Sequence, residues 1–131
     1  MKQERKIPLK DYIAGGAMAN AITWIVLGIG SSAVPPDFFI ATYLVGSILG
    51  GFLVGRKIRQ EFVKTGLLTG IFSFVVHVYV FLGVFWLLSI PAPPLEWHAI
   101  IFSVLLLGSC LGALLSKLII LEKHEAQSSS E

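Results

Sequence analysis

The chain divides into long apolar stretches separated by short polar ones. Four apolar stretches stand out, at residues 12–30, 38–55, 65–90 and 97–121. Each is close in length to the ~20 residues that a helix needs to cross the hydrocarbon core of a bilayer. None shows the alternating polarity of a membrane β-strand, and a helix satisfies its own backbone hydrogen bonds in lipid. The pattern therefore predicts an all-α integral membrane protein with four spanning helices packed as a four-helix bundle.

The composition also favours a membrane protein. Of the 131 residues, 55% are hydrophobic and only 14% are charged, and the mean hydropathy is +0.81. A soluble domain carries about 25% charged residues. We expect a single transmembrane domain over residues 1–131, in which the polar end, residues 122–131, forms a disordered cytoplasmic tail.

The positions of the positive charges predict how the chain threads through the membrane. Lysine and arginine occur in three places: Lys2, Arg5, Lys6 and Lys10 before the first stretch, Arg56, Lys57, Arg59 and Lys64 between the second and third, and Lys117 and Lys123 at the end of the fourth. Because cytoplasmic loops are rich in Lys and Arg, both termini are predicted to be cytoplasmic in a multi-pass cell-membrane protein. The first stretch is polar for a membrane helix, and a re-entrant or split element is the alternative there.

The second and fourth stretches share a glycine–serine pattern. "GSILGGFLVG" begins at Gly46 and "GSCLGALLSK" begins at Gly108, so a shift of 62 aligns them. A shift of 50 places Gly16 on Gly66 and Thr23 on Ser73. These matches predict two tandem helical hairpins that form a parallel internal repeat, with its pseudo-axis along the membrane normal.

Small residues recur three or four apart in every apolar stretch. The strips are Gly46 with Gly50; Ser47 with Gly51 and Gly55; Gly108 with Gly112 and Ser116; Gly66 with Gly70 and Ser73; and Gly16 with Asn20 and Thr23. Lipid supplies no hydrophobic force between helices, so such strips let the backbones approach closely. They predict tight helix packing of the glycine-zipper kind. A glycine-lined substrate or ion path and an interface to another protein are the alternatives.

His77 is the strongest candidate for a polar site within the membrane, together with Asn20, Thr23 and Ser73. Ionisable residues at this depth usually face protein or water. The residue can relay a proton, bind a metal, contact a quinone or lipid headgroup, or simply hydrogen-bond Asn20 or Thr23. We expect it to be buried in protein, with polar neighbours from the first or fourth helix. Glu96 and His98 are placed at the outer surface.

The remaining polar residues suggest little chemistry. Arg56, Lys57, Arg59 and Lys64 form a basic cluster that sets topology and, as a functional extension, binds anionic lipid headgroups. Cys110 and His77 alone do not make a closed metal site, so no metal and no cofactor are expected. The chain has no nucleophile elbow, HExxH, phosphate loop or CxxC motif, and an enzyme is not expected.

The central third of the chain resembles a known kind of protein. The basic N-terminus, "GSILGGFLVGRKI" and "KTGLLTGIF" together are similar to small four-helix membrane proteins of bacteria and archaea that are grouped in families of unknown function. The positions that carry the resemblance are Gly50, Gly51, Gly55, Arg56, Gly66 and Gly70. The resemblance implies a helical fold and a membrane location, and it implies no activity.

Two functions are compatible with these patterns. The first is a structural or accessory integral membrane protein that associates with itself or with a larger membrane complex, because many small-residue faces are available. The alternative is a small transporter or channel that acts as an oligomer with His77 in its path. The expected partners are the bilayer, anionic lipid and a second copy or another membrane protein, and no nucleic acid.

Overall fold

The computed structural model describes residues 9–30, 35–89 and 94–130. These residues form four α-helices: α1 (Leu9–Gly30), α2 (Pro36–Ile58), α3 (Phe62–Leu88) and α4 (Leu95–Ser129). No strand occurs in the described ranges. The prediction of an all-α protein with four helices is therefore confirmed.

Proline and a left-handed residue set three of the helix boundaries. Pro35 and Pro94 precede α2 and α4 in an extended conformation, with ψ near 152° in both. A proline is tolerated where a helix begins, because the first backbone N–H groups have no partner within the helix. At the other end of α2, Arg59 is left-handed (φ 55°), and its backbone N–H donates to the Gly55 carbonyl at 3.0 Å. This cap ends α2, and α3 begins three residues later.

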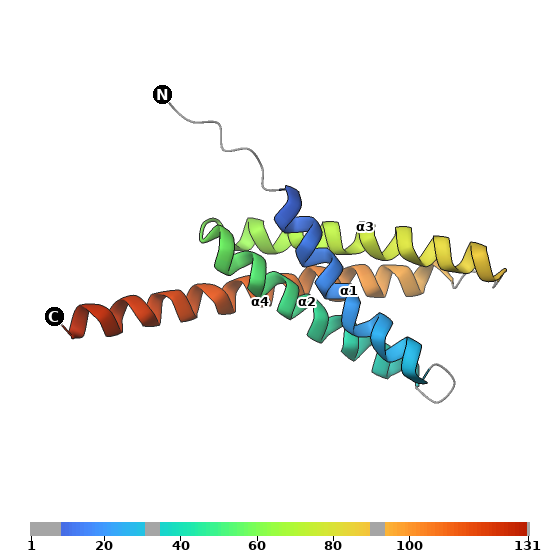
Figure 1. The fold of residues 1–131 in the computed structure, drawn as a ribbon, viewed down its shortest axis with the longest axis horizontal. Helices are drawn as coiled ribbons and strands as arrows, with labels where there is room; N and C mark the ends of the chain where they lie inside the picture. The colour runs from blue at the N-terminus through green and yellow to red at the C-terminus, as the bar shows by residue number, and fades with distance from the viewer. Residues whose placement is uncertain (1–8, 31–34, 90–93, 131) are drawn as a thin grey trace, which may run out of the picture.

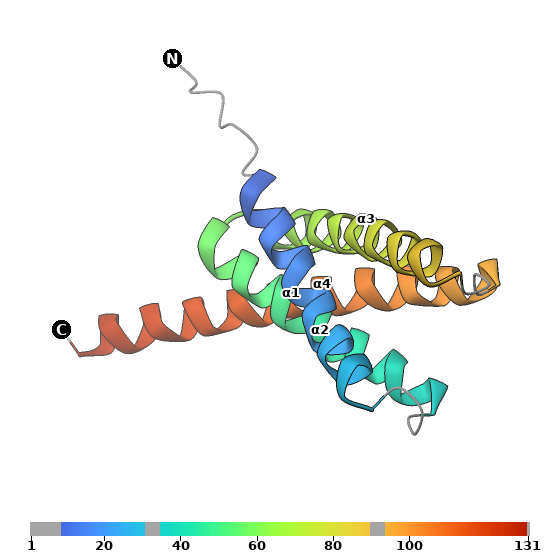
Figure 2. The ribbon, with the colours of Figure 1, turned by 45° about the vertical axis from the view of Figure 1, so that its right-hand side comes forward.

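The helices form two hairpins that cross each other. In Figure 1, α3 and α4 run side by side along the long axis, and α1 and α2 cross them obliquely. Figure 2 shows the same crossing from another side. Helix α2 contacts all three other helices, most extensively α4, whereas α1 contacts α2 and α3 and scarcely touches α4. Among the described residues, one side of α1 therefore has no helix packed against it.

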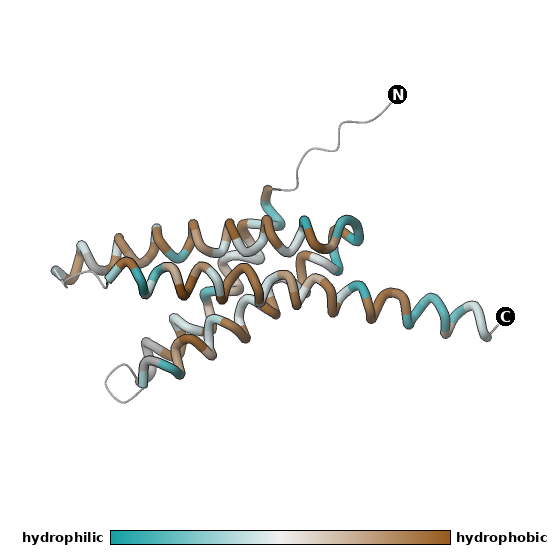
Figure 3. Tube along the Cα trace, turned by 180° about the vertical axis from the view of Figure 1, so that it is seen from behind, coloured by the Kyte–Doolittle hydropathy of each residue, from teal (hydrophilic) through white to brown (hydrophobic). Residues whose placement is uncertain are grey.

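The interior is more polar than the surface. Buried polar side chains include Asn20, Thr23, Ser47, Ser73 and His77, each with 2% exposure or less. Large apolar side chains, by contrast, are exposed along all four helices. In Figure 3, apolar colour runs along the helices, and hydrophilic colour is concentrated at the turn between α2 and α3 and at the C-terminal part of α4. A protein folded in water has the reverse distribution.

Three helices are long and apolar enough to cross a membrane. They are α2 from Asp37 to Ile58, α3 and α4, judged by length and composition over the described residues. The sequence pattern predicts a fourth span at residues 12–30, within α1, which stays a prediction.

The end of the chain differs from the expected disordered tail. Helix α4 continues to Ser129, so the described part of residues 122–131 is helical. The physical reason is that this segment, "EKHEAQ", is rich in good helix formers and extends an existing helix. Continuing a helix avoids the nucleation cost that makes a short isolated helix unstable.

Candidate functional site

The glycine strips of α2 and α4 pack against each other. A methyl group on Gly51 would overlap the backbone of Ser109, and one on Gly112 would overlap the backbone of Ile48. In the same way Gly108 lies against Ser47. The two backbones approach so closely because neither helix has a side chain at these positions. The strip Ser47–Gly51–Gly55 therefore meets the strip Gly108–Gly112–Ser116.

The other predicted strips lie at the remaining helix contacts. Gly46 and Gly50 lie against Ala19 and Gly15 of α1, and Gly16 lies against the backbone of Phe72 and Ser73 in α3. Between α3 and α4, a methyl group on Gly66 would come within 2.6 Å of Cys110 Cα, and one on Gly70 within 2.8 Å of Leu106 Cα. All nine glycines named from their spacing are buried against another helix.

The aligned halves of the expected repeat make different contacts. Gly46 faces α1, whereas its sequence equivalent Gly108 faces α2. The face of α4 that packs on α3 carries Leu106 and Cys110 instead. The glycine–serine pattern therefore serves different partners in the two hairpins, and the similarity in sequence does not extend to equivalent contacts.

Asn20 and Thr23 hold α1 to its neighbours. Asn20 Nδ2 donates to the carbonyl oxygens of Gly16, at 2.7 Å, and Ser73, at 3.0 Å, so it links α1 to α3. Thr42 donates to the Phe39 carbonyl at 2.7 Å, which leaves the Thr23 hydroxyl to donate to Thr42 at 3.0 Å and link α1 to α2. Both residues act between helices.

His77 is fully buried, and its hydrogen-bond partner comes from α2. The hydroxyl of Tyr43 and Nδ1 of His77 share a hydrogen bond of 2.9 Å. The sequence pattern predicts burial, which the structure shows, but it predicts a partner from the first or fourth helix, and that is wrong. Asn20 and Thr23 are occupied elsewhere. The four residues predicted as one polar site therefore take part in three different links, of which Asn20 and the backbone of Ser73 share one.

Aromatic rings surround His77. The rings of Phe81, Tyr43 and His98 have centroids 5.1, 5.2 and 5.7 Å from the imidazole, and Trp97 lies at 6.0 Å. His98 packs here and is only half-exposed, which corrects its expected place at the outer surface. The correction arises because α4 begins at Leu95, so residue 98 already lies on the first helical turn beside α3.

The cluster around His77 retains unused polar atoms. Among the described residues, His77 Nε2 and His98 Nδ1 are buried without a hydrogen-bond partner, as is Asn20 Oδ1. Such atoms cost free energy in an apolar interior unless a water or ligand meets them. No three His, Cys, Asp or Glu side chains come together in the described part of the chain.

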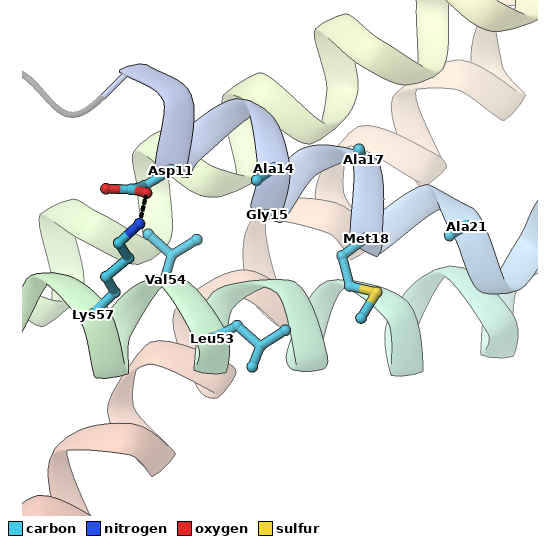
Figure 4. Close-up of a pocket in the computed structure, with 9 residues that line it drawn as sticks. All are labelled: Asp11, Ala14, Gly15, Ala17, Met18, Ala21, Leu53, Val54 and Lys57. Atoms are coloured by element: carbon cyan, nitrogen blue, oxygen red, sulfur yellow. Dashed lines mark hydrogen bonds and ion pairs between the residues drawn. The ribbon is translucent and has the colours of Figure 1, made fainter.

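A groove runs along the outer side of α1 and α2 (Figure 4). It has a volume of about 580 Å³ and is lined by small and apolar side chains, namely Ala14, Gly15, Ala17, Met18 and Ala21 of α1 and Leu53 and Val54 of α2. At one end Asp11 and Lys57 form an ion pair of 2.5 Å. The groove is thus apolar along its length and carries one acid and one base at its end.

The four residues of the expected basic cluster separate in the structure. Lys57 pairs with Asp11, and Lys64 pairs with Glu61 at 3.3 Å. The Arg56 guanidinium lies 5.9 Å from the centre of the Phe52 ring, and Arg59 Nε donates to the Arg56 carbonyl at 3.1 Å. Two of the four are therefore compensated by acidic groups, and the two arginines are oriented differently.

Comparisons with known proteins give no match. Neither protein-family models, nor curated proteins, nor solved structures show a significant similarity to the chain. The resemblance to small four-helix membrane proteins stays a prediction, and function has to be inferred from the residues themselves.

Proposed function

We propose that the chain is an integral membrane protein with a structural or accessory role, which associates with a second copy of itself through the groove between α1 and α2. The observation that carries the self-association is the groove, because its α1 wall exposes the small side chains of Ala14 and Ala17. No catalytic activity is part of this role.

The distribution of polarity supports a membrane location. Exposed leucines, isoleucines and valines occur along every helix, whereas serine, threonine and asparagine are inside. In water this surface would form apolar patches far larger than a monomer tolerates. In lipid this surface faces acyl chains. Several buried hydroxyl groups donate to carbonyls of their own helix, and Asn20, Thr23 and Tyr43 make hydrogen bonds between helices. The positions of Lys and Arg support cytoplasmic termini and four crossings.

The shape of the groove supports a helix as its occupant. Helices associate in lipid where small residues allow close approach, and Ala14, Ala17 and Ala21 offer such a surface. The charged end favours a second copy in particular. Two copies with the same orientation in the membrane, related by a two-fold axis along its normal, bring Asp11 of one copy to the depth of Lys57 of the other. An interface of this symmetry is self-complementary.

Filling the groove tests this role. Ala17→Trp places a bulky ring in the groove, and we expect it to convert a dimer to a monomer. The control is Ala99→Trp, which adds the same ring at an exposed position of α4 outside the groove. The measurement is photobleaching step counts of single labelled proteins in liposomes. A dimer that survives Ala17→Trp would contradict the proposed interface, and a native chain that is monomeric would contradict self-association.

A transport function is the second candidate, because buried ring nitrogens of His77 and His98 have no partner in the described residues. Such groups can pass a proton or hold a small polar ligand in an oligomer. Proteoliposomes loaded with a pH-sensitive dye would report proton flux. Flux that is unchanged by His77→Ala would remove this residue from the candidate path, and no flux from the native protein would count against proton transport.

A further inference from the structure

A small hollow lies where the end of α2 meets the C-terminal part of α4. Its volume is about 180 Å³, and four basic side chains line it: Arg56 and Arg59 from the end of α2, and Lys123 and His124 from α4. Ile119 and Ile120 form an apolar wall beside them. Residues more than 60 positions apart in the sequence thus bring basic groups to one place.

The positive charge in this hollow is not compensated within the described residues. Lys57 and Lys64 pair with acidic groups, but neither arginine of the hollow nor Lys123 has an ion pair there. Arg56, Arg59 and Lys123 are solvent-exposed, so salt screens their mutual repulsion, but three positive charges beside one small hollow create a potential that attracts an anion. The charge distribution therefore points to a negatively charged ligand.

The kind of basic group indicates which anion fits. A guanidinium presents several N–H donors in a planar fork that matches two oxygens of a phosphate group. The Arg59 Nε donates to the Arg56 carbonyl, and this hydrogen bond orients the guanidinium. The terminal N–H groups of Arg59 stay available for a ligand. Lys123 adds a mobile point charge from the opposite helix.

We propose that this hollow binds a phosphate group, through Arg56, Arg59 and Lys123, with His124 at its side. The isoleucine wall favours a phosphate that is esterified to an apolar molecule, as in the headgroup of an anionic phospholipid. Free phosphate shares the same recognition chemistry. The site differs from the basic cluster predicted from sequence, because it excludes Lys57 and Lys64 and includes two residues of α4. The proposal depends on the proposed membrane location only where it names a lipid as the source of the phosphate.

The test compares two charge-matched double variants. Arg56→Gln/Lys123→Gln removes two positive charges from the hollow, and the control Lys57→Gln/Lys64→Gln removes two from outside it. Binding is measured by native mass spectrometry of the detergent-purified protein with phosphatidylglycerol, with phosphatidylcholine and with inorganic phosphate. We expect the first variant to weaken phosphatidylglycerol binding at least about tenfold, since hydrogen bonds to charged groups are lost. The control should change it by less than about twofold.

The outcomes distinguish a lipid from free phosphate as the ligand, and specific from unspecific binding. Inorganic phosphate that binds the native protein and competes with the lipid identifies the phosphate group alone as the ligand. Equal losses in both variants would show unspecific attraction to charge and overturn the proposal, as would no preference of the native protein for phosphatidylglycerol over phosphatidylcholine. Because Arg56 also contacts Phe52, the single variant Lys123→Gln provides the readout if the double variant unfolds. A monomer in detergent suffices, so this test does not depend on the α1–α2 interface.

Discussion

The hydrogen bond between the Tyr43 hydroxyl and Nδ1 of His77 joins two buried side chains of α2 and α3. Both side chains are 1% exposed or less. When one partner of such a pair is removed, the other is left buried and unsatisfied, and the cost exceeds the net value of the bond itself. The pair therefore offers a direct measure of how polar contacts hold these helices together.

We expect Tyr43→Phe to lower the free energy of unfolding by about 1 kcal/mol, because it removes only the hydroxyl and leaves His77 Nδ1 without a partner. Tyr79→Phe is the matched control, since Tyr79 is 82% exposed and should tolerate the change. The measurement is reversible unfolding in mixed micelles. Introducing His77→Phe into the Tyr43→Phe variant should lower the free energy of unfolding by less than His77→Phe lowers it in the native protein. Effects that simply add would exclude coupling between the two residues.

At the residue scale, the sequence identified His77 but not its surroundings. An isolated histidine in an apolar stretch is conspicuous, and its burial follows from the cost of exposing it to lipid. Its partner was not predictable, because the rotation of each helix about its own axis depends on packing across the whole chain. Nothing in the sequence distinguishes Tyr43 from the other tyrosines of the apolar stretches. His98 differs from its expected place for a related reason, since the apolar stretch begins at residue 97 and α4 begins at Leu95.

Among the helix contacts, the one between α2 and α4 depends most on glycine, which has no side chain. The two strips meet backbone to backbone, so even one methyl group has no space unless a helix moves. Overpacking of this kind typically costs about 1–3 kcal/mol. Stability should therefore be more sensitive to the size of a residue here than to its polarity.

We expect Gly51→Ala to lower the midpoint of thermal unfolding in detergent, because the new Cβ would overlap Ser109. Gly50→Leu should lower it further, because its larger side chain meets Gly15 and Ala19 of α1. Gly83→Ala is the control: a Cβ there meets nothing within 4 Å, and alanine favours the helix. Leu53→Ala should also have little effect on folding, since Leu53 is 47% exposed. An unchanged midpoint for both Gly51→Ala and Gly50→Leu would contradict close packing.

The sequence predicted the helical elements well and their partners poorly. Spacing by four shows which residues share a face of one helix, because helical geometry fixes it. It does not show which neighbour that face meets. Gly46 and Gly108 look equivalent in sequence, yet they face α1 and α2 respectively, because α2 is central and carries two small-residue faces. The helical C-terminal end of α4 does not follow from composition, because composition alone does not show that extending an existing helix is favourable.

For the molecule as a whole, the testable prediction is the direction in which the chain threads. With Cys110 replaced by serine, single cysteines at Ser32 and Pro93 should react with an impermeant maleimide added to intact cells. Single cysteines at Gln60 and Ser129 should react only after permeabilisation, since Lys and Arg cluster near them. Reaction at position 60 in intact cells would reverse the proposed orientation. Labelling at both 32 and 60 in intact cells would show that α2, which lies between them, does not cross.

The contact between α2 and α4 also has a consequence during synthesis. The ribosome releases the α1–α2 hairpin first, so Gly46 and Gly50 can meet α1 while the rest of the chain is still being made. The adjacent face of α2, at Gly51 and Gly55, has its partner on the last helix and stays bare until Ser116 has been added. During that interval an unrelated helix with a similar strip can occupy it. The nascent protein is thus vulnerable to wrong pairing from the synthesis of α2 until α4 has been made, and a translational pause after α3 would lengthen this interval.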